Sequence, residues 1–193
     1  MKRDKIMGET TITKLPTEQG GEAVDSIMDL QRLFPPKLRY TRQEIEAHVN
    51  DPGNLALFLL RDDKVSGYIL AFPQDAAVEM LKMDDPLMRK DSQRYYIDQV
   101  AVKPDEHGSL EFLDLAYALL EELGRRGINR VSSHLLSANG LDKTVHEIFG
   151  PMSTECRQVC MPDCDDAPFL YMEVTYRGVE FGTYVRCRAK MMG

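Results

Sequence analysis

The sequence lacks tryptophan and any long apolar run, and it has few cysteines and aromatic residues. Among 193 residues there are 4 cysteines, and aromatic side chains make up 8%. No apolar stretch approaches the roughly 20 residues that cross a bilayer. The longest, residues 55–60, has the length of one buried strand, so we expect no membrane partner. So few cysteines in a chain of this size are typical of reduced thiols rather than a disulfide-bonded fold.

An excess of basic charge and a recognisable secretion signal are also missing. The chain has 24 basic and 31 acidic side chains, a net charge of −7. A nucleic-acid binder needs a concentrated lysine and arginine face, so this balance disfavours a nucleic-acid partner and is compatible with an amine-bearing substrate. Residues 1–5 are charged, but no apolar segment or cleavage site follows them. We therefore expect a cytoplasmic protein.

The composition that is present is typical of one folded domain. Hydrophobic residues make up 43% and charged residues 28% of the chain, which excludes a disordered or collagen-like protein. We expect a flexible N-terminus over residues 1–9, a single domain over residues 10–178, and a C-terminal extension over residues 179–193 that could add a strand.

Cap and turn residues divide the chain into helices and strands. Pro35-Pro36 ends the first expected helix, and Thr41 with Glu44 forms the capping-box pattern that begins the second. Apolar periodicity predicts helices over residues 22–34, 42–49, 110–126 and 141–149, and strands over residues 10–15, 55–60, 65–72, 95–102, 130–136, 169–176 and 183–188. The long helix should bury a stripe of Leu113, Ala116, Tyr117, Leu120 and Leu123. This order predicts the α/β class, with a single mixed sheet covered by helices on both faces.

Residues 74–94 form a polar, acidic and methionine-rich segment between two expected strands. Ala77, Met80 and Leu81 could line one face of a short helix that ends before Pro86. Two interpretations stay open: a surface excursion, or a lid or partner-binding flap, since methionine suits adaptable surfaces.

The strand that ends at Lys103-Pro104 leads into the longest expected helix. The first turn of a helix presents unpaired backbone N–H groups and a partial positive charge, which suits a phosphate or pyrophosphate. Many strand–helix units bind nothing, so this pattern alone does not specify a ligand.

Residues 100–108 and the helix after them resemble the GNAT superfamily of N-acetyltransferases. In that family a strand precedes an Arg/Gln-x-x-Gly-x-Gly/Ala loop, a helix, a glycine, a further strand and the pattern Asn-x-x-Ala-x-x-Leu-Tyr-x-x-x-Gly. The matching positions in this chain are Pro104, Gly108, Gly127, Asn139, Val145, His146 and Gly150. The resemblance extends over residues 10–176 and is strongest over residues 96–150. It implies a mostly antiparallel central sheet of about six to seven strands flanked by helices.

The resemblance also implies a co-substrate and an acceptor. Acetyl-coenzyme A would be held by the backbone of Val100, Ala101 and Val102 and by the turn of His107, Gly108 and Ser109, without a metal ion. Asn139 would contact the pantetheine arm, although a cap or turn role before Gly140 is equally open. The acceptor would be a small-molecule or peptide amine. Exposed strand edges or the C-terminal extension could pair two chains in a homodimer.

Two residues stand at the family's catalytic positions. Asp98 takes the place of a glutamate that acts as general base, directly or through water, provided burial raises its pKa. A strand acid bonded to a turn is the structural alternative. His146 replaces the tyrosine that protonates the leaving thiolate, and a protonated imidazole could do the same; a solvated or packing histidine is the alternative. Other hydroxyls are offered by Tyr95, Tyr96, Tyr117 and Tyr171.

The chain departs from the family pattern in the pyrophosphate loop. His107 replaces its basic or amide residue, and Leu110 and Phe112 stand where the family has glycine or alanine. Bulky side chains there would hinder the close approach of backbone to phosphate. Two functions therefore stay open: an acetyltransferase with a modified cofactor site, or a non-catalytic GNAT-like module that senses a ligand or binds a protein.

Two further patterns point to other chemistries. Ser132-Ser133-His134 lacks the Gly-x-Ser-x-Gly elbow of a serine hydrolase, so we reject that class. Cysteines at four-residue spacing could share a helix face and bind zinc or an iron–sulfur cluster. The set lacks a Cys-x-x-Cys knuckle and Pro162 interrupts it, so free thiols are the favoured interpretation. Its members are Cys156, Cys160, Cys164 and Cys187.

Overall fold

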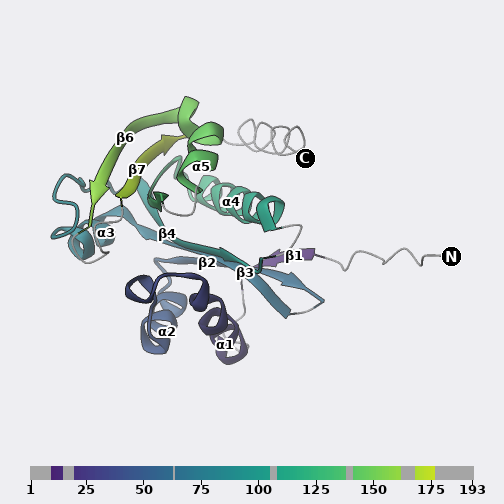
Figure 1. Ribbon diagram of the computed structural model, residues 1–193. Coiled ribbons are helices and arrows are strands. Elements are labelled where there is room, and N and C mark those ends of the chain that lie inside the picture. The colour runs from purple at the N-terminus through teal and green to yellow at the C-terminus, as the bar shows by residue number, and fades with distance from the viewer. Residues whose placement is uncertain are drawn as a thin grey trace.

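A sheet of seven strands forms the centre of the protein, with helices on both faces (Figure 1). The computed structural model describes residues 10–14, 20–62, 64–104, 108–137, 141–161 and 168–176. The strands are β1 (Thr10–Thr13), β2 (Leu55–Arg61), β3 (Lys64–Pro73), β4 (Arg94–Val102), β5 (Arg130–Leu136), β6 (Ser153–Cys160) and β7 (Pro168–Thr175). They lie in the order β1-β2-β3-β4-β5-β7-β6. Within the described residues β4 and β5 are parallel and the other neighbours are antiparallel.

The helices form two layers around this sheet. They are α1 (Gly20–Leu30), α2 (Arg42–Asn50), α3 (Gln74–Leu81), α4 (Gly108–Arg125) and α5 (Leu141–Phe149), with 3₁₀ turns η2 (Gln31–Leu33), η3 (Pro36–Leu38) and η5 (Gly150–Met152). Helices α1 and α2 cover one face, and α4 and α5 cover the other (Figure 1). The predicted α/β class, with a mixed and mostly antiparallel sheet, is confirmed. None of the described helices is both long enough and apolar enough to cross a bilayer.

Local signals fix several of the element boundaries. Thr41 and Glu44 form the predicted capping box at the start of α2: the Glu44 carboxylate accepts a hydrogen bond from the Thr41 backbone N–H at 2.7 Å. Strands β2 and β3 form the predicted hairpin, and Asp62 in its turn adopts φ 51°. Asp tolerates this left-handed conformation better than most residues.

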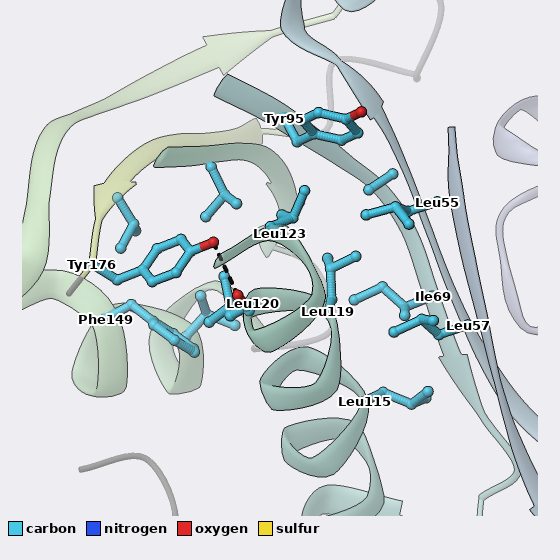
Figure 2. Close-up of a cluster of buried hydrophobic side chains, with 14 of the residues drawn as sticks. Leu55, Leu57, Ile69, Tyr95, Leu115, Leu119, Leu120, Leu123, Phe149 and Tyr176 are labelled. Carbon is cyan, nitrogen blue, oxygen red and sulfur yellow. Dashed lines mark hydrogen bonds between the residues drawn. The ribbon is translucent and has the colours of Figure 1, made fainter. Parts of the chain in front are cut away.

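The larger hydrophobic core lies between the sheet and helices α4 and α5. Figure 2 shows leucines of α4 packed toward side chains of β2 and β3, with Tyr176 and Phe149 beside them. The hydroxyl of Tyr176 donates to the backbone carbonyls of Leu120 at 3.2 Å and Ile128 at 2.9 Å, which ties the end of β7 to α4. A second core under α1 and α2 covers the opposite face.

The predicted buried stripe of helix α4 needs correction. The stripe on α4 includes Leu115 and Leu119, which are fully buried, whereas Tyr117 is only half-buried and its hydroxyl donates to Glu121. Residues 74–94 lie mostly at the surface, as both interpretations of this segment require, and Met80, Met83 and Leu87 are exposed. The buried side chains of Gln74, Asp85 and Met88 attach the segment to the rest of the fold.

The cysteine hypothesis also changes. Cys156 and Cys160 lie on strand β6, a strand that is not among those predicted from the sequence, and not on a helix. Both are exposed free thiols, and four residues along a strand separate them by about 13 Å. No group of three or more metal-binding side chains occurs in the described ranges. Cys164, Cys187 and the strand expected over residues 183–188 lie outside the described residues.

Candidate active site

Strands β4 and β5 separate partway along their length. They pair in parallel over four residues each, from Arg94–Ile97 on β4 and Arg130–Ser133 on β5. Beyond this point β4 continues alongside β3 to Val102, and β5 continues alongside β7 to Leu136. The two strands are therefore held apart by different partners, and the sheet is split between them.

A cavity of about 880 Å³ occupies this split. Its walls include residues 96–102 of β4 and residues 131–136 of β5, so both strand edges face it. Residues from both faces of the sheet complete the lining. On the α4 and α5 side these are Phe112, Ala116, Leu120, Val145 and Phe149, and on the other side Leu33 to Tyr40, Glu44, Met80, Leu81 and Asp84. A cavity of this size accommodates a large cofactor arm together with a second molecule.

Asp98 stands at the point where the strands separate. Ile97 pairs with Ala71 and Gln99 with the preceding Leu70, so Asp98 is the extra residue of a β-bulge. Bulges re-aim side chains and often lie beside active sites. Asp98 lines the cavity, and its Oδ2 atom is buried without a hydrogen-bond partner. Burial raises the pKa of Asp98 to about 7, although a hydrogen bond from Tyr40 opposes the rise.

A buried glutamine pair holds the loop that carries Tyr40 against β4. Gln99 Nε2 donates to the carbonyl of Leu38 at 2.7 Å, and Gln31 Oε1 accepts from the Tyr40 backbone N–H at 2.9 Å. Gln31 Nε2 also donates to Gln99 Oε1 at 2.5 Å. Burial, followed by the charge of Asp98, raises the pKa of Tyr40, so its hydroxyl keeps the proton that it donates to Asp98. In the sequence, Pro35-Pro36 is the only signal of this loop, and it does not indicate the contact of Tyr40 with Asp98.

The predicted cofactor residues Val100, Ala101 and Val102 all line the cavity. The backbone N–H of Lys103 donates to Ser66 on β3 at 2.8 Å. Because backbone groups alternate in direction along a strand, those of Val100 and Val102 face the opposite edge, toward the split.

The described part of the cofactor loop is limited to its two ends. Helix α4 begins at Gly108. Phe112 is half-buried, packs against the larger core and forms part of the cavity wall. His107 and Asn139, together with the side chains of Ser109 and Leu110, lie outside the described residues.

His146 lies away from this cavity. It is exposed on α5, and its Nδ1 atom is 3.9 Å from Sγ of Cys156. Its neighbours Val145 and Phe149 line the cavity, whereas His146 does not. All four candidate tyrosines are in the described part of the chain, and of these Tyr96 lines the cavity. The structure thus brings Asp98 together with Val100, Ala101 and Val102, but not with His146.

Comparison with known proteins gives a consistent result for the fold. No family model matches the sequence, and no curated protein is significantly similar to it. A crystal structure of aminoglycoside 6'-acetyltransferase type Ii matches with a TM-score of 0.64 at 18% identity, over 86% of this chain and 96% of that one. The NatC complex bound to Gag peptide and CoA matches with a TM-score of 0.66 at 14% identity, over 88% and 99%. The ribosomal-protein-S18-alanine N-acetyltransferase from Escherichia coli matches with a TM-score of 0.60 at 14% identity, over 89% of this chain and 97% of that one.

The chain has the GNAT N-acetyltransferase fold. The strand and helix on which the sequence resemblance depends are β4 and α4 of this GNAT fold, so the predicted fold is confirmed. The split between β4 and β5, with Asp98 at its apex, is the candidate active site of this GNAT-fold protein.

Proposed function

We propose that the protein is an acyl-coenzyme A-dependent N-acyltransferase that moves an acetyl group to an amine by direct attack. The observation that carries this proposal is the Asp98 carboxyl group, which lines the split between β4 and β5 with an unpaired Oδ2 atom and a pKa of about 7. A general base is most effective when its pKa lies near the working pH.

The cofactor arm would lie along the open edge of β4. Backbone N–H and C=O groups of Val100 and Val102 are available there for a pantetheine amide, and apolar residues of α4 and α5 cover the far wall. The bound thioester would supply the activated acyl group. Structural neighbours support this choice: the NatC complex was crystallised with CoA, and an N-acetyltransferase from Thermoplasma acidophilum with coenzyme A (TM-score 0.53, 13% identity).

Asp98 would prepare the acceptor for attack. An amine arrives mainly as an ammonium ion, and the Asp98 carboxylate takes one proton from it, leaving a nitrogen lone pair. The hydrogen bond from Tyr40 fixes the carboxylate in its position. Holding the amine against the thioester carbonyl supplies a further large part of the rate gain.

The η2–η3 side of the cavity indicates the acceptor chemistry. Its wall is mostly apolar, and Glu44, Asp84 and Asp98 bring negative charge to it. Lys37 and Arg39 lie on the same side, which disfavours a polycation. We therefore propose a primary amine on an apolar body, either a small molecule or the N-terminus of a peptide.

An acetyl-transfer assay tests the proposal. Purified protein is incubated with acetyl-CoA and one of three acceptors: 2-phenylethylamine, an alanine-initiated peptide or an aminoglycoside. Free CoA is measured by chromatography, because the exposed thiols of Cys156 and Cys160 would react with a thiol reagent. We expect an acetylated product, detected by mass spectrometry, with 2-phenylethylamine preferred over the aminoglycoside. Failure to acetylate any of the three would contradict the proposal.

One observation favours a non-catalytic GNAT-like module as the second candidate. His146, the residue at the family's thiolate-protonating position, lies outside the cavity. A module of this kind would bind CoA or another ligand in the split without turning it over. Binding of CoA together with the absence of any acetylated product would identify this function.

A further inference from the structure

A buried series of hydrogen bonds, here named the relay, leads away from the cavity. It joins side chains of three strands and of the turn after α3: Tyr96, His134, Asp85 and Arg157. The hydroxyl of Tyr96 lies 3.0 Å from Nδ1 of His134, and Nε2 of His134 lies 2.9 Å from Oδ2 of Asp85. Arg157 on β6 donates to the same Asp85 oxygen at 2.6 Å. Tyr96 belongs to β4 and His134 to β5, so the relay crosses from one strand to the other beside the split.

Other side chains bury the tyrosine, histidine and aspartate of the relay. Tyr96 is 4% exposed, His134 9% and Asp85 2%. The His134 ring packs between those of Tyr96 and Tyr171, with ring centroids 5.7 Å and 4.8 Å away. Arg157 lies over the Tyr171 ring at 4.3 Å. Buried polar groups in such an arrangement keep one geometry, because any displacement would leave a charge or a donor unpaired.

The protonation states of Asp85 and His134 determine which group donates in each hydrogen bond of the relay. Burial alone would raise the pKa of Asp85, but hydrogen bonds from His134 and Arg157 lower it to about 2, so Asp85 is a carboxylate. Burial lowers the pKa of His134, although Asp85 opposes this, so the ring is neutral at pH 7. A carboxylate only accepts hydrogen bonds, which assigns the imidazole proton to Nε2. Nδ1 therefore accepts a hydrogen bond from the Tyr96 hydroxyl.

We propose that Tyr96 is a catalytic residue that exchanges a proton with the reacting atoms, and that His134 and Asp85 are positioning residues that make this exchange possible. This proposal rests on the proposed acyltransferase function. The two residues have separate roles. Asp98 removes the first proton from the ammonium ion, and Tyr96 accepts the second proton from the amine nitrogen.

The proton exchange balances without an added reagent. As the amine nitrogen forms its bond to the thioester carbon, its remaining excess proton passes to the Tyr96 oxygen, and the Tyr96 proton passes to Nδ1 of His134. The imidazolium that results is stabilised by the Asp85 carboxylate. When the C–S bond breaks, Nδ1 returns its proton to Tyr96, and Tyr96 donates a proton to the thiolate. Counted from the neutral amine that Asp98 leaves, one N–H bond is lost and one S–H bond is formed, and a C–N bond replaces the C–S bond; the first proton leaves Asp98 for solvent.

The position of Tyr96 fits this role. It pairs with Ser132 one position before the last pair of the parallel ladder, and it precedes Asp98 by two residues. It lines the cavity, whereas His146 does not. Burial, followed by the charge of Asp98, raises the pKa of Tyr96, so its hydroxyl is protonated and can donate.

The kinetic test compares two relay variants with a matched control. In Tyr96→Phe the hydroxyl is removed; in His134→Gln the amide can still accept from Tyr96 and donate to Asp85, but it cannot take up a proton. Tyr176→Phe removes a hydroxyl that also lies in the buried core, but that donates to the backbone carbonyls of Leu120 and Ile128. Single-turnover transfer from acetyl-CoA to 2-phenylethylamine is measured beside the Kd for CoA.

We expect Tyr96→Phe and His134→Gln to slow transfer by about 10² or more, the usual contribution of a proton-transfer group, with the Kd for CoA changed by less than about threefold. Tyr176→Phe should stay within about threefold of wild type in both measurements. Transfer by a folded His134→Gln or Tyr96→Phe variant at close to the wild-type rate would overturn the relay and leave the acyltransferase function intact.

A second measurement needs no acceptor. Nitrogen-15 NMR of the wild-type protein at pH 7 should show His134 with its proton on Nε2 and an accepting Nδ1, and Tyr96→Phe should shift the Nδ1 resonance. A proton on Nδ1, or a charged ring, would overturn the relay whether or not the protein acetylates an amine. A wild-type protein that shows the expected tautomer but acetylates nothing would instead contradict the proposed function.

Discussion

At the scale of single residues, the carboxyl group of Asp98 controls the proposed reaction through its protonation. Its pKa of about 7 means that the fraction able to accept a proton increases as the pH rises. We predict that the transfer rate rises with pH through about 7 and then levels off. A pH–rate profile of the wild-type protein checks this, and a rate that falls across that interval would contradict it.

Replacement of the same carboxyl group separates its role from general packing. Asp98→Asn keeps the shape of the side chain but cannot accept the proton, so we expect a loss of about 10² in rate with little change in CoA binding. Asp29→Asn on the exposed surface of α1 is the matched control and should behave as wild type. Equal rates for the two variants would exclude Asp98 as the base.

The raised pKa of Asp98 also predicts how stability depends on pH. Between its ordinary pKa of 3.8 and about 7 the folded state binds more protons than the unfolded state, so this group destabilises the fold increasingly as the pH rises. We expect Asp98→Asn to increase the free energy of unfolding by about 1–3 kcal/mol at pH 8 and to have little effect near pH 4. Urea unfolding at both pH values checks this. The same increase at both would show that the carboxyl charge is not its cause.

At the scale of secondary-structure elements, replacing two glycines by alanine should change the stability of the fold in opposite directions. A Cβ atom at Gly67 on β3 would lie 2.9 Å from the carbonyl oxygen of Ala101 on β4, whereas one at Gly124 on α4 would meet nothing within 4 Å. We expect Gly67→Ala to destabilise the protein by about 1–3 kcal/mol, because a backbone atom must move. Gly124→Ala should stabilise it by about 0.5–1 kcal/mol through helix propensity. Urea unfolding of both variants checks this; destabilisation by both would contradict it.

Elements with local signals could be predicted from the sequence, and those without could not. The capping box fixed the start of α2, and strand β5 and helix α5 have the predicted bounds. Strand β6 was missed because it is an edge strand with mostly polar, exposed residues, of which Val159 alone is fully buried. Helix α4 buries Leu115 and Leu119 together with the predicted stripe apart from Tyr117, because its packed face is wider than one row of residues.

At the scale of the whole molecule, the candidate site depends on contacts between distant segments. Asp98 could be selected because its position in the strand matches a family pattern. The contact of His134 with Asp85 joins residues 49 apart, and that of Gln31 with Gln99 joins residues 68 apart. No local pattern encodes such pairs, so the buried relay and the loop that holds Tyr40 became visible only in the folded chain.

The proposed function depends most on the binding of coenzyme A in the split between β4 and β5. Ala116 on α4 lines the cavity, and a phenylalanine there would extend into it. Lys143 is exposed on α5, so Lys143→Phe adds the same side chain outside the cavity and serves as the control.

Isothermal titration of CoA into the wild-type protein, Ala116→Phe and Lys143→Phe tests this claim most directly. We predict a Kd of about 1–100 μM for the wild-type protein and for Lys143→Phe, and binding by Ala116→Phe weakened by about tenfold or more. The absence of binding to the wild-type protein at about 1 mM CoA, or equal affinity in all three proteins, would contradict the account.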